Sequence, residues 1–275
     1  MLECVVNLSE GRDRTWLDAC AASLGPALLD LHADRWHHRS VFTLAGPAVE
    51  AVARDLATAA LARLDLTGHE GVHPRGGVVD VVPFAPLGPQ GMQPGGDLTE
   101  AVAARDRFAR WAGDELGIPC FCYGPERALP DIRRHAFRDL RPDTGPDRPH
   151  PTAGAICVGA RGALVAYNLW LAGPDLEVAK RIAAALRSAE VRSLGLAVGD
   201  EVQVSCNLVA PWRVGPAEVF DQVENTAHIA RAELVGLVPE KVLAAIPRRR
   251  WGSLGLGEGS TIEARLAKAG IELSV

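Results

Sequence analysis

The segment Ser40–Leu64 reads SVFTLAGPAVEAVARDLATAALARL and contains two elements with different hydrophobic patterns. β-branched and apolar side chains over Ser40–Leu44 predict a β-strand. Gly46 and Pro47 end the strand pattern. The alanine-rich apolar pattern that follows them predicts a helix over Ala48–Leu64. This strand–helix pair is the centre of the predicted fold.

Apolar segments on both sides extend the pair into the order strand, helix, strand, strand, helix, strand. A loop rich in glycine and histidine precedes the last strand of this series. The additional predicted elements of the first half, in chain order, are a strand at Glu3–Asn7, a helix at Arg12–Leu24, a strand at Ala27–Leu31, a strand at Val78–Phe84, a helix at Leu98–Leu116 and a strand at Cys120–Tyr123.

The same order of elements recurs in the second half, after a loop at Arg138–Pro151 that is dense in proline, aspartate and arginine. The predicted elements there are strands at Ala163–Trp170, Leu194–Val198, Glu201–Val209 and Glu233–Val238, and helices at Leu176–Leu186 and Pro216–Ala232.

The repeated order predicts an α/β protein of the α+β class, made of two ferredoxin-like βαββαβ subdomains. We place an N-terminal subdomain with the chemical loop at residues 1–160 and a C-terminal subdomain at residues 161–275. Each antiparallel sheet would carry helices on one face. We therefore expect the two sheets to pack face to face, with the helices outside and a cleft between the halves.

Composition argues against several classes of partner. The 275 residues carry a formal net charge of −5, whereas proteins that bind nucleic acid usually show a basic face. No apolar run approaches the roughly 20 residues that span a bilayer, and no secretory signal pattern opens the chain. We therefore expect a cytoplasmic protein with no nucleic-acid or membrane partner. Most of the six scattered cysteines are predicted to be reduced core residues.

The residues best suited to chemistry lie in one loop, Thr67–Asp80, which reads TGHEGVHPRGGVVD. Its His69–His73 segment matches the letters of the H-E-x-x-H zinc motif, which requires both histidines on one face of a helix. Gly71 weakens a helix, and Pro74 biases the residue before it away from the helical region. We therefore expect no metal site, and a zinc-dependent hydrolase is the least favoured function.

His73 is the predicted catalytic residue of this loop. Pro74 favours an extended conformation at His73, and Gly76 and Gly77 would let a substrate approach the backbone. An imidazole with the ordinary pKa of about 6.5 can accept a proton near neutral pH. From the residue chemistry alone, a solvated surface loop without a catalytic role stays open as the alternative.

Charged side chains near the loop are predicted to bind substrate. Arg75 could hold a carboxylate through two hydrogen bonds, and Asp80 could orient a histidine or cap the turn. The cluster of His32, His37, His38 and Arg39 before the strand at Ser40–Leu44 could form a second wall of the same cleft or a metal patch, and the lack of acidic partners at fixed spacing disfavours the metal. The predicted substrate-binding residues are Arg39, Arg75, His32, His38 and Asp80.

Several segments of the chain resemble the glutamate formimidoyltransferase family, which includes the N-terminal part of formimidoyltransferase-cyclodeaminases. The similarity is carried by ECVVNLSEGR at Glu3–Arg12, RSVFTLAGP at Arg39–Pro47 and HEGVHPRGGVVDVVPF at His69–Phe84. Shorter segments follow in the family's order, among them Leu129–Arg133 and Val204–Leu208. Together they span nearly the whole chain.

The resemblance implies transfer of the formimino group of N-formimino-L-glutamate to tetrahydrofolate, in histidine degradation and one-carbon metabolism, by a homodimer. It implies that His73 is the catalytic base. Because the chain ends at Val275, near where the transferase part would finish, only the transfer step is expected. The folate-binding residues that it implies are Gly145, Pro146, Asp147, Arg148, Pro149, His150, Pro151, Thr152, Ala153 and Gly154.

The sequence departs from the family pattern near the expected site. His32 stands where an acidic residue is expected, and His38 stands where asparagine is expected before Arg39. The segment at residues 145–154 lacks the expected aromatic residues. A non-catalytic or re-purposed relative that binds a folate or a small acidic ligand is therefore the main alternative function.

Overall fold

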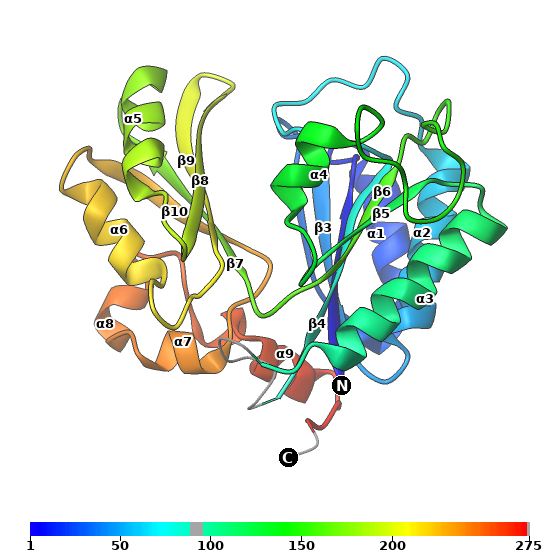
Figure 1. Ribbon diagram of the computed structural model, residues 1–275. Coiled ribbons are helices and arrows are strands. Elements are labelled where there is room, and N and C mark those ends of the chain that lie inside the picture. The colour runs from blue at the N-terminus through cyan, green and yellow to red at the C-terminus, as the bar shows by residue number, and fades with distance from the viewer. Residues whose placement is uncertain (89–95, 274–275) are drawn as a thin grey trace. The chain divides into compact units, whose positions relative to one another are not determined.

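The computed structural model describes residues 1–88 and 96–273, and its contacts divide the chain into two units. The first unit comprises Met1–Gly162 together with Leu273, and the second comprises Ala163–Glu272. Each unit contains one sheet with helices packed on it (Figure 1). The predicted α+β class with two sheets is confirmed, and the packing of one sheet against the other stays a prediction.

The first unit is a mixed sheet with helices on both faces. In chain order its elements are β1 (Leu2–Leu8), α1 (Arg14–Ser23), a 3₁₀ turn (Gly25–Ala27), β2 (Leu28–Asp34), β3 (Arg39–Ala45), α2 (Val49–Arg63), β4 (Val79–Pro86), α3 (Thr99–Glu115), β5 (Cys120–Tyr123), α4 (Leu129–His135) and β6 (Ile156–Ala160).

The strand order of this sheet is β2-β3-β1-β4-β6-β5. β1 runs antiparallel to both β3 and β4, and β2 runs antiparallel to β3. These four strands with α1 and α2 form the ferredoxin-like unit that the sequence predicts. β6 and β5 extend the sheet in parallel beside β4, and the sequence patterns did not predict β6.

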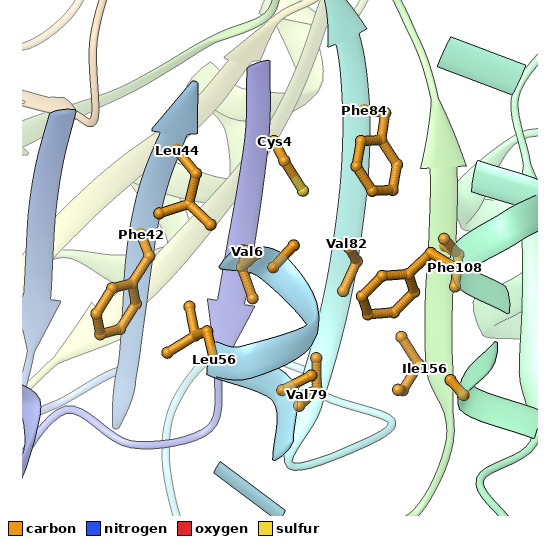
Figure 2. Packing of buried hydrophobic residues seen from close by; sticks show 14 of the residues in the cluster. Cys4, Val6, Phe42, Leu44, Leu56, Val79, Val82, Phe84, Phe108 and Ile156 are labelled. Atoms are coloured by element: carbon orange, nitrogen blue, oxygen red, sulfur yellow. The ribbon is translucent and has the colours of Figure 1, made fainter. Parts of the chain in front are cut away.

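The main core of the first unit lies between the sheet and the helices α1, α2 and α3. Leu56 of α2 and Phe108 of α3 pack against Val6, Phe42 and Phe84 of the strands (Figure 2). Each large apolar side chain buried in this way contributes about 1.5–3 kcal/mol relative to an exposed one. All six cysteines are buried and free, as predicted. This core fixes the strands whose other face carries the candidate site.

The opposite face of the sheet corrects the expectation that helices lie on one face only. Helix α4 lies on the other side of the sheet from α1, α2 and α3 (Figure 1). Its Ile132 is buried in a smaller cluster with Val81, Phe121, Tyr123 and Cys157 of the central and edge strands. A seven-residue helix therefore covers the β4–β6–β5 part of this face.

A β-bulge in β4 turns Asp80 toward the α4 face. Asn7 of β1 pairs with Val81, whereas the next residue, Leu8, pairs with Val79, so Asp80 is the extra residue on β4. Regular alternation would direct Asp80 to the same side as Val82, into the apolar core under α2 and α3. Bulges often re-aim a side chain beside a functional site.

The second unit repeats the ferredoxin-like order around a four-stranded antiparallel sheet, β10-β7-β9-β8. α5 and α6 bury their apolar faces in a separate core on this sheet. The elements in chain order are β7 (Val165–Leu171), α5 (Leu176–Leu186), β8 (Val191–Val198), β9 (Glu201–Leu208), α6 (Pro216–Glu224), β10 (Ile229–Val235), α7 (Glu240–Ala244), α8 (Arg248–Trp251), a 3₁₀ turn (Glu258–Ser260) and α9 (Ile262–Lys268).

The end of α6 differs from the prediction of a helix that continues to Ala232. The helix ends at Glu224, and β10 begins at Ile229, which pairs with Leu171 of β7. The carboxylate of Glu224 accepts a hydrogen bond of 2.8 Å from the backbone N–H of Ile229 and stabilises the change of direction. Strand pairing thus prevails over local helix propensity here.

Among the described residues, no helix is long and apolar enough to cross a membrane.

Candidate active site

The chemical loop joins α2 to β4 and contains no helical turn between residues 64 and 78. The prediction that Gly71 and Pro74 prevent the helix of a zinc motif is therefore confirmed. Nε2 of His69 lies 2.9 Å from the carbonyl oxygen of Ser9, and its Nδ1 faces the guanidinium group of Arg75. A cation in contact with one ring nitrogen and a carbonyl on the other do not fit a metal ligand.

Asp80 is the buried centre of the site, and its side chain is 0% exposed. Its Oδ2 accepts hydrogen bonds from Arg39 at 2.6 Å and from Arg133 at 2.5 Å. Its Oδ1 accepts a bond of 2.7 Å from the backbone N–H of Gly76. Burial alone raises a carboxyl pKa, but the two guanidinium groups outweigh it and hold the pKa of Asp80 well below its usual range. One carboxylate thus connects β3, α4 and the chemical loop.

Arg39 is held at the floor of the site by two partners. Oδ1 of Asn7, on the neighbouring strand β1, accepts hydrogen bonds from Nε at 3.0 Å and from Nη2 at 2.8 Å. Asp80 binds the third nitrogen, Nη1. The positive charge of Arg39 therefore has a fixed position, which suits the predicted role in binding a substrate anion.

His73 has one ring nitrogen engaged and the other available. Nδ1 lies 2.6 Å from the carbonyl oxygen of Pro74, and because a carbonyl can only accept, Nδ1 is the donor. Nε2 is then the acceptor nitrogen. It has no hydrogen-bond partner among residues 1–88 and 96–273. Burial of the ring, followed by the charge of Arg39, lowers the pKa of His73 to about 3, although Asp80 opposes the shift. The imidazole is therefore neutral at physiological pH.

We expect the ring of His73 to show no titration between pH 5 and 8. With a pKa of about 3, nearly all His73 rings are already unprotonated throughout this pH range. This differs from the ordinary value of about 6.5 that the sequence suggested. The measurement is an NMR titration of the histidine ring carbons in the folded protein, with His73→Gln assigning the resonance. In urea-unfolded protein the same resonance should titrate near pH 6.5. A midpoint near 6.5 in the folded state would contradict the burial argument.

The turn between β2 and β3 holds the chemical loop from the other side. The backbone N–H of Val72 donates to the carbonyl oxygen of Trp36 at 3.1 Å. Nη2 of Arg75 donates to the carbonyl oxygens of His37 at 3.1 Å and of His73 at 2.7 Å. Arg75 thus ties the backbone of His73 to the neighbouring turn. Its predicted role as a carboxylate ligand stays a prediction.

His38 adds a second contact between this turn and the loop. Its ring stacks on that of His69 with centroids 3.9 Å apart. Its Nδ1 lies 3.0 Å from the carbonyl oxygen of Glu70, and its Nε2 lies 3.2 Å from a carboxylate oxygen of Glu10. The backbone at His38 has a φ of 48°, a left-handed conformation that is uncommon for a residue with a side chain. The ring is therefore held in place from both ends.

His32 lies farther from the loop than the other predicted residues. It is on β2, the edge strand, with β3 and β1 between it and the strand of Asp80. His32 pairs with Val41 of β3, and directly paired residues point to the same face of a sheet. His32 therefore shares a sheet face with Arg39, which lies two residues from Val41.

The predicted folate segment meets the chemical loop at one end. Gly154 forms a bridge with Gly77, and the backbone N–H of Ala155 donates to the carbonyl oxygen of Gly76 at 2.9 Å. Gly154 has a φ of 71°, and a Cβ there would lie only 2.2 Å from that carbonyl oxygen. Only glycine allows this approach. At the other end, a Cβ on Gly145 would lie 2.6 Å from the carbonyl oxygen of Ile118, beside β5.

Four residues of the site are not among the predicted site residues: Asn7, Ser9, Glu10 and Arg133. Asn7 shares a face of β1 with Glu3 and Val5, so alternation along the strand could have indicated it. Oγ of Ser9, the residue after β1, donates to the carbonyl oxygen of Gly77 at 2.8 Å and so stabilises the chemical loop. The family resemblance includes the segment Leu129–Arg133, but no local pattern indicated that Arg133 contacts Asp80, because the two residues are 53 positions apart.

The chain is similar to known proteins over most of its length. The family model for the formiminotransferase domain, N-terminal subdomain, matches residues 1–161. A glutamate formimidoyltransferase from Thermoplasma acidophilum is 34% identical across 98% of this chain and 98% of that protein. One from Streptococcus pyogenes is 33% identical across 88% of this chain and 90% of that protein. The formimidoyltransferase-cyclodeaminase of Sus scrofa is 31% identical across 88% of this chain and 51% of that protein.

The fold and the candidate site together define an α+β protein whose first sheet carries a neutral histidine and two arginines that are fixed by a buried carboxylate. The matches then identify its relatives. The chain belongs to the formiminotransferase domain family, and it is an enzyme of the one-carbon transferase class.

Proposed function

We propose that the protein is a glutamate formimidoyltransferase, which transfers the formimino group of N-formimino-L-glutamate to tetrahydrofolate with His73 as general base. The observation that carries the proposal is the state of His73, whose Nδ1 donates to the Pro74 carbonyl while Nε2 is the available acceptor. The similarity to two named glutamate formimidoyltransferases over most of the chain supports the choice of substrates.

The reaction requires one proton to leave the acceptor and one to reach the leaving group. N5 of tetrahydrofolate attacks the formimino carbon, and Nε2 of His73 takes the proton from N5 as the new C–N bond forms. The tetrahedral adduct then breaks its bond to the glutamate nitrogen, and the imidazolium returns the proton to that nitrogen. A positioned base of this kind contributes about 10²–10⁴-fold, and alignment of the two substrates supplies much of the remainder.

The low pKa of His73 has two main causes, burial of the ring first and the positive charge of Arg39 second, and an anionic substrate would offset the second. A general base works best when its pKa lies near the operating pH, and a value of about 3 is well below this. The positive charge of Arg39 is one cause of the low value. A donor carboxylate bound near Arg39 would offset part of this charge and raise the pKa of His73 in the complex.

The remaining predicted residues fit this proposal as binding groups. Arg75, His38 and Asp80 would shape the donor site, with His32 farther along the same sheet face. The segment Gly145–Gly154 would form part of the folate wall, and its junction with the loop at Gly77 supports this placement. We also propose a cytoplasmic homodimer that needs no metal; the family resemblance is the basis for the dimer, and the non-helical backbone around Gly71 and Pro74 is the basis for the lack of a metal. Light scattering of the purified protein tests the dimer.

The test of the function is an assay of metal-stripped protein with N-formimino-L-glutamate, with and without tetrahydrofolate. We expect release of glutamate only when tetrahydrofolate is present, together with a stoichiometric formimino-folate product. Glutamate release that needs zinc and not folate would instead establish a hydrolase. Saturable folate binding without turnover would establish the non-catalytic relative.

A further inference from the structure

Arg133 stands at the boundary between the buried centre of the site and its surface. Its neighbour in α4, Ile132, is 1% exposed and anchors the helix to the sheet. The side chain of Arg133 is 25% exposed, whereas the Asp80 carboxylate that it contacts is 0% exposed. The guanidinium group therefore covers the buried carboxylate and presents part of its surface outward.

The same guanidinium group lies against the chemical loop. A Cβ added at Gly76 would lie 3.0 Å from Nη1 of Arg133, so the absence of a side chain at Gly76 gives the arginine its place. Gly76 is three residues from His73. Arg133 therefore contacts the loop that carries the predicted base.

The hydrogen bonds of the two arginines on Asp80 differ. Arg39 uses Nε, Nη1 and Nη2 on Asn7 and Asp80, so every nitrogen of its guanidinium group has a partner. Arg133 uses only Nη2, which donates to Asp80. The described part of the chain supplies no acceptor for its Nε or Nη1. The single carboxylate of Asp80 also faces two guanidinium groups, those of Arg39 and Arg133. One of the two positive charges is therefore not compensated by Asp80.

We propose that Arg133 is a carboxylate-binding residue of the site, in which Asp80 fixes one nitrogen and the free edge of the guanidinium group receives a substrate carboxylate. The inference rests on the proposed function and adds a specificity-determining residue to it. The planar guanidinium fork matches a carboxylate in two parallel hydrogen bonds, and an arginine that is already oriented loses less side-chain entropy on binding. The carboxylate belongs either to the formimino donor or to the glutamate tail of the folate.

The experiment compares Arg133→Met and Arg133→Lys with the wild-type enzyme, varying each substrate in turn. We expect Arg133→Met to raise the KM of one substrate by about 10- to 100-fold, the range of a lost hydrogen bond to a charged group, with a smaller change in kcat. The KM of Arg133→Lys should lie between those of the wild type and Arg133→Met, because lysine keeps the positive charge but lacks the planar fork of donors. A rise confined to the donor assigns the donor carboxylate. A rise for tetrahydrofolate that is absent for tetrahydropteroate, which lacks the glutamate, assigns the folate tail.

Arg134→Met is the matched control, because Arg134 is 65% exposed on the same helix and pairs with Asp131 on the surface. We expect its KM values to equal those of the wild type. Calorimetric titration with L-glutamate and with tetrahydrofolate measures the same loss without turnover, so it tests Arg133 even if the proposed transfer reaction is absent. Unchanged KM values and unchanged binding of both ligands in Arg133→Met would overturn the proposal. A fall in kcat alone, equal in both variants, would show that Arg133 only supports Asp80 and would also overturn it.

Discussion

Replacing His73 by alanine is expected to lower kcat by about 10²–10⁴-fold, the usual contribution of a positioned general base. The physical reason is the loss of Nε2, the ring nitrogen that remains available once Nδ1 donates to the Pro74 carbonyl. Little loss of stability is expected, because the loop is held by Arg75 and Ser9 rather than by the imidazole of His73. Single-turnover kinetics at saturating substrates is the measurement, since it separates the chemical step from product release.

The matched control for this variant is His135→Ala. His135 is 41% exposed on α4 and pairs with Asp139 on the surface. Its removal should leave kcat within a factor of about two, because exposed ion pairs contribute little.

His69 is the competing candidate for the base, but both of its ring nitrogens are engaged with Ser9 and Arg75. An unchanged single-turnover rate in His73→Ala would rule out the proposed mechanism.

Replacing Asp80 by asparagine is expected to cost about 3–5 kcal/mol of unfolding free energy, the range for breaking a buried ion pair by removing one partner. Asparagine has nearly the same shape and can still accept from the N–H of Gly76. It leaves the guanidinium groups of Arg39 and Arg133 without their counter-charge. Urea unfolding followed by circular dichroism gives the free-energy difference. A loss below about 1 kcal/mol would show that the three charges are well solvated.

The pH dependence of this loss has a defined sign. The pKa of Asp80 is lowered in the folded protein, so its contribution is complete above the unfolded value of about 3.9 and declines as the pH falls below it. The difference between wild type and Asp80→Asn should therefore be constant from pH 5 to 7 and become smaller below about pH 4. Asp131→Asn, which removes an exposed partner of Arg134, should cost no more than about 0.5 kcal/mol at any of these pH values.

The local patterns of the sequence predicted most of the elements that carry the site. Val78–Phe84 and Ser40–Leu44 were expected as strands, and both are found; β3 is one residue longer at each end, whereas β4 begins one residue later and ends two residues later than expected. The loop between α2 and β4 was correctly expected to avoid a helix, because the effects of Gly71 and Pro74 on the backbone are local. The short helix α4 was not predicted, since seven residues give too little periodicity to recognise.

What the sequence determined by itself is the loop with its histidines, the two ferredoxin-like series of elements and the family resemblance, since these depend on neighbouring residues or on whole segments. Only the tertiary structure decided that Asp80 faces Arg39 and Arg133. That contact requires a bulge that shifts the alternation of β4 by one residue and a helix that packs on the second face of the sheet. The pKa of His73 has the same origin. Pro74 and the glycines determine the backbone at His73, but the burial and the charge of Arg39 that lower its pKa come from strands far away in the sequence.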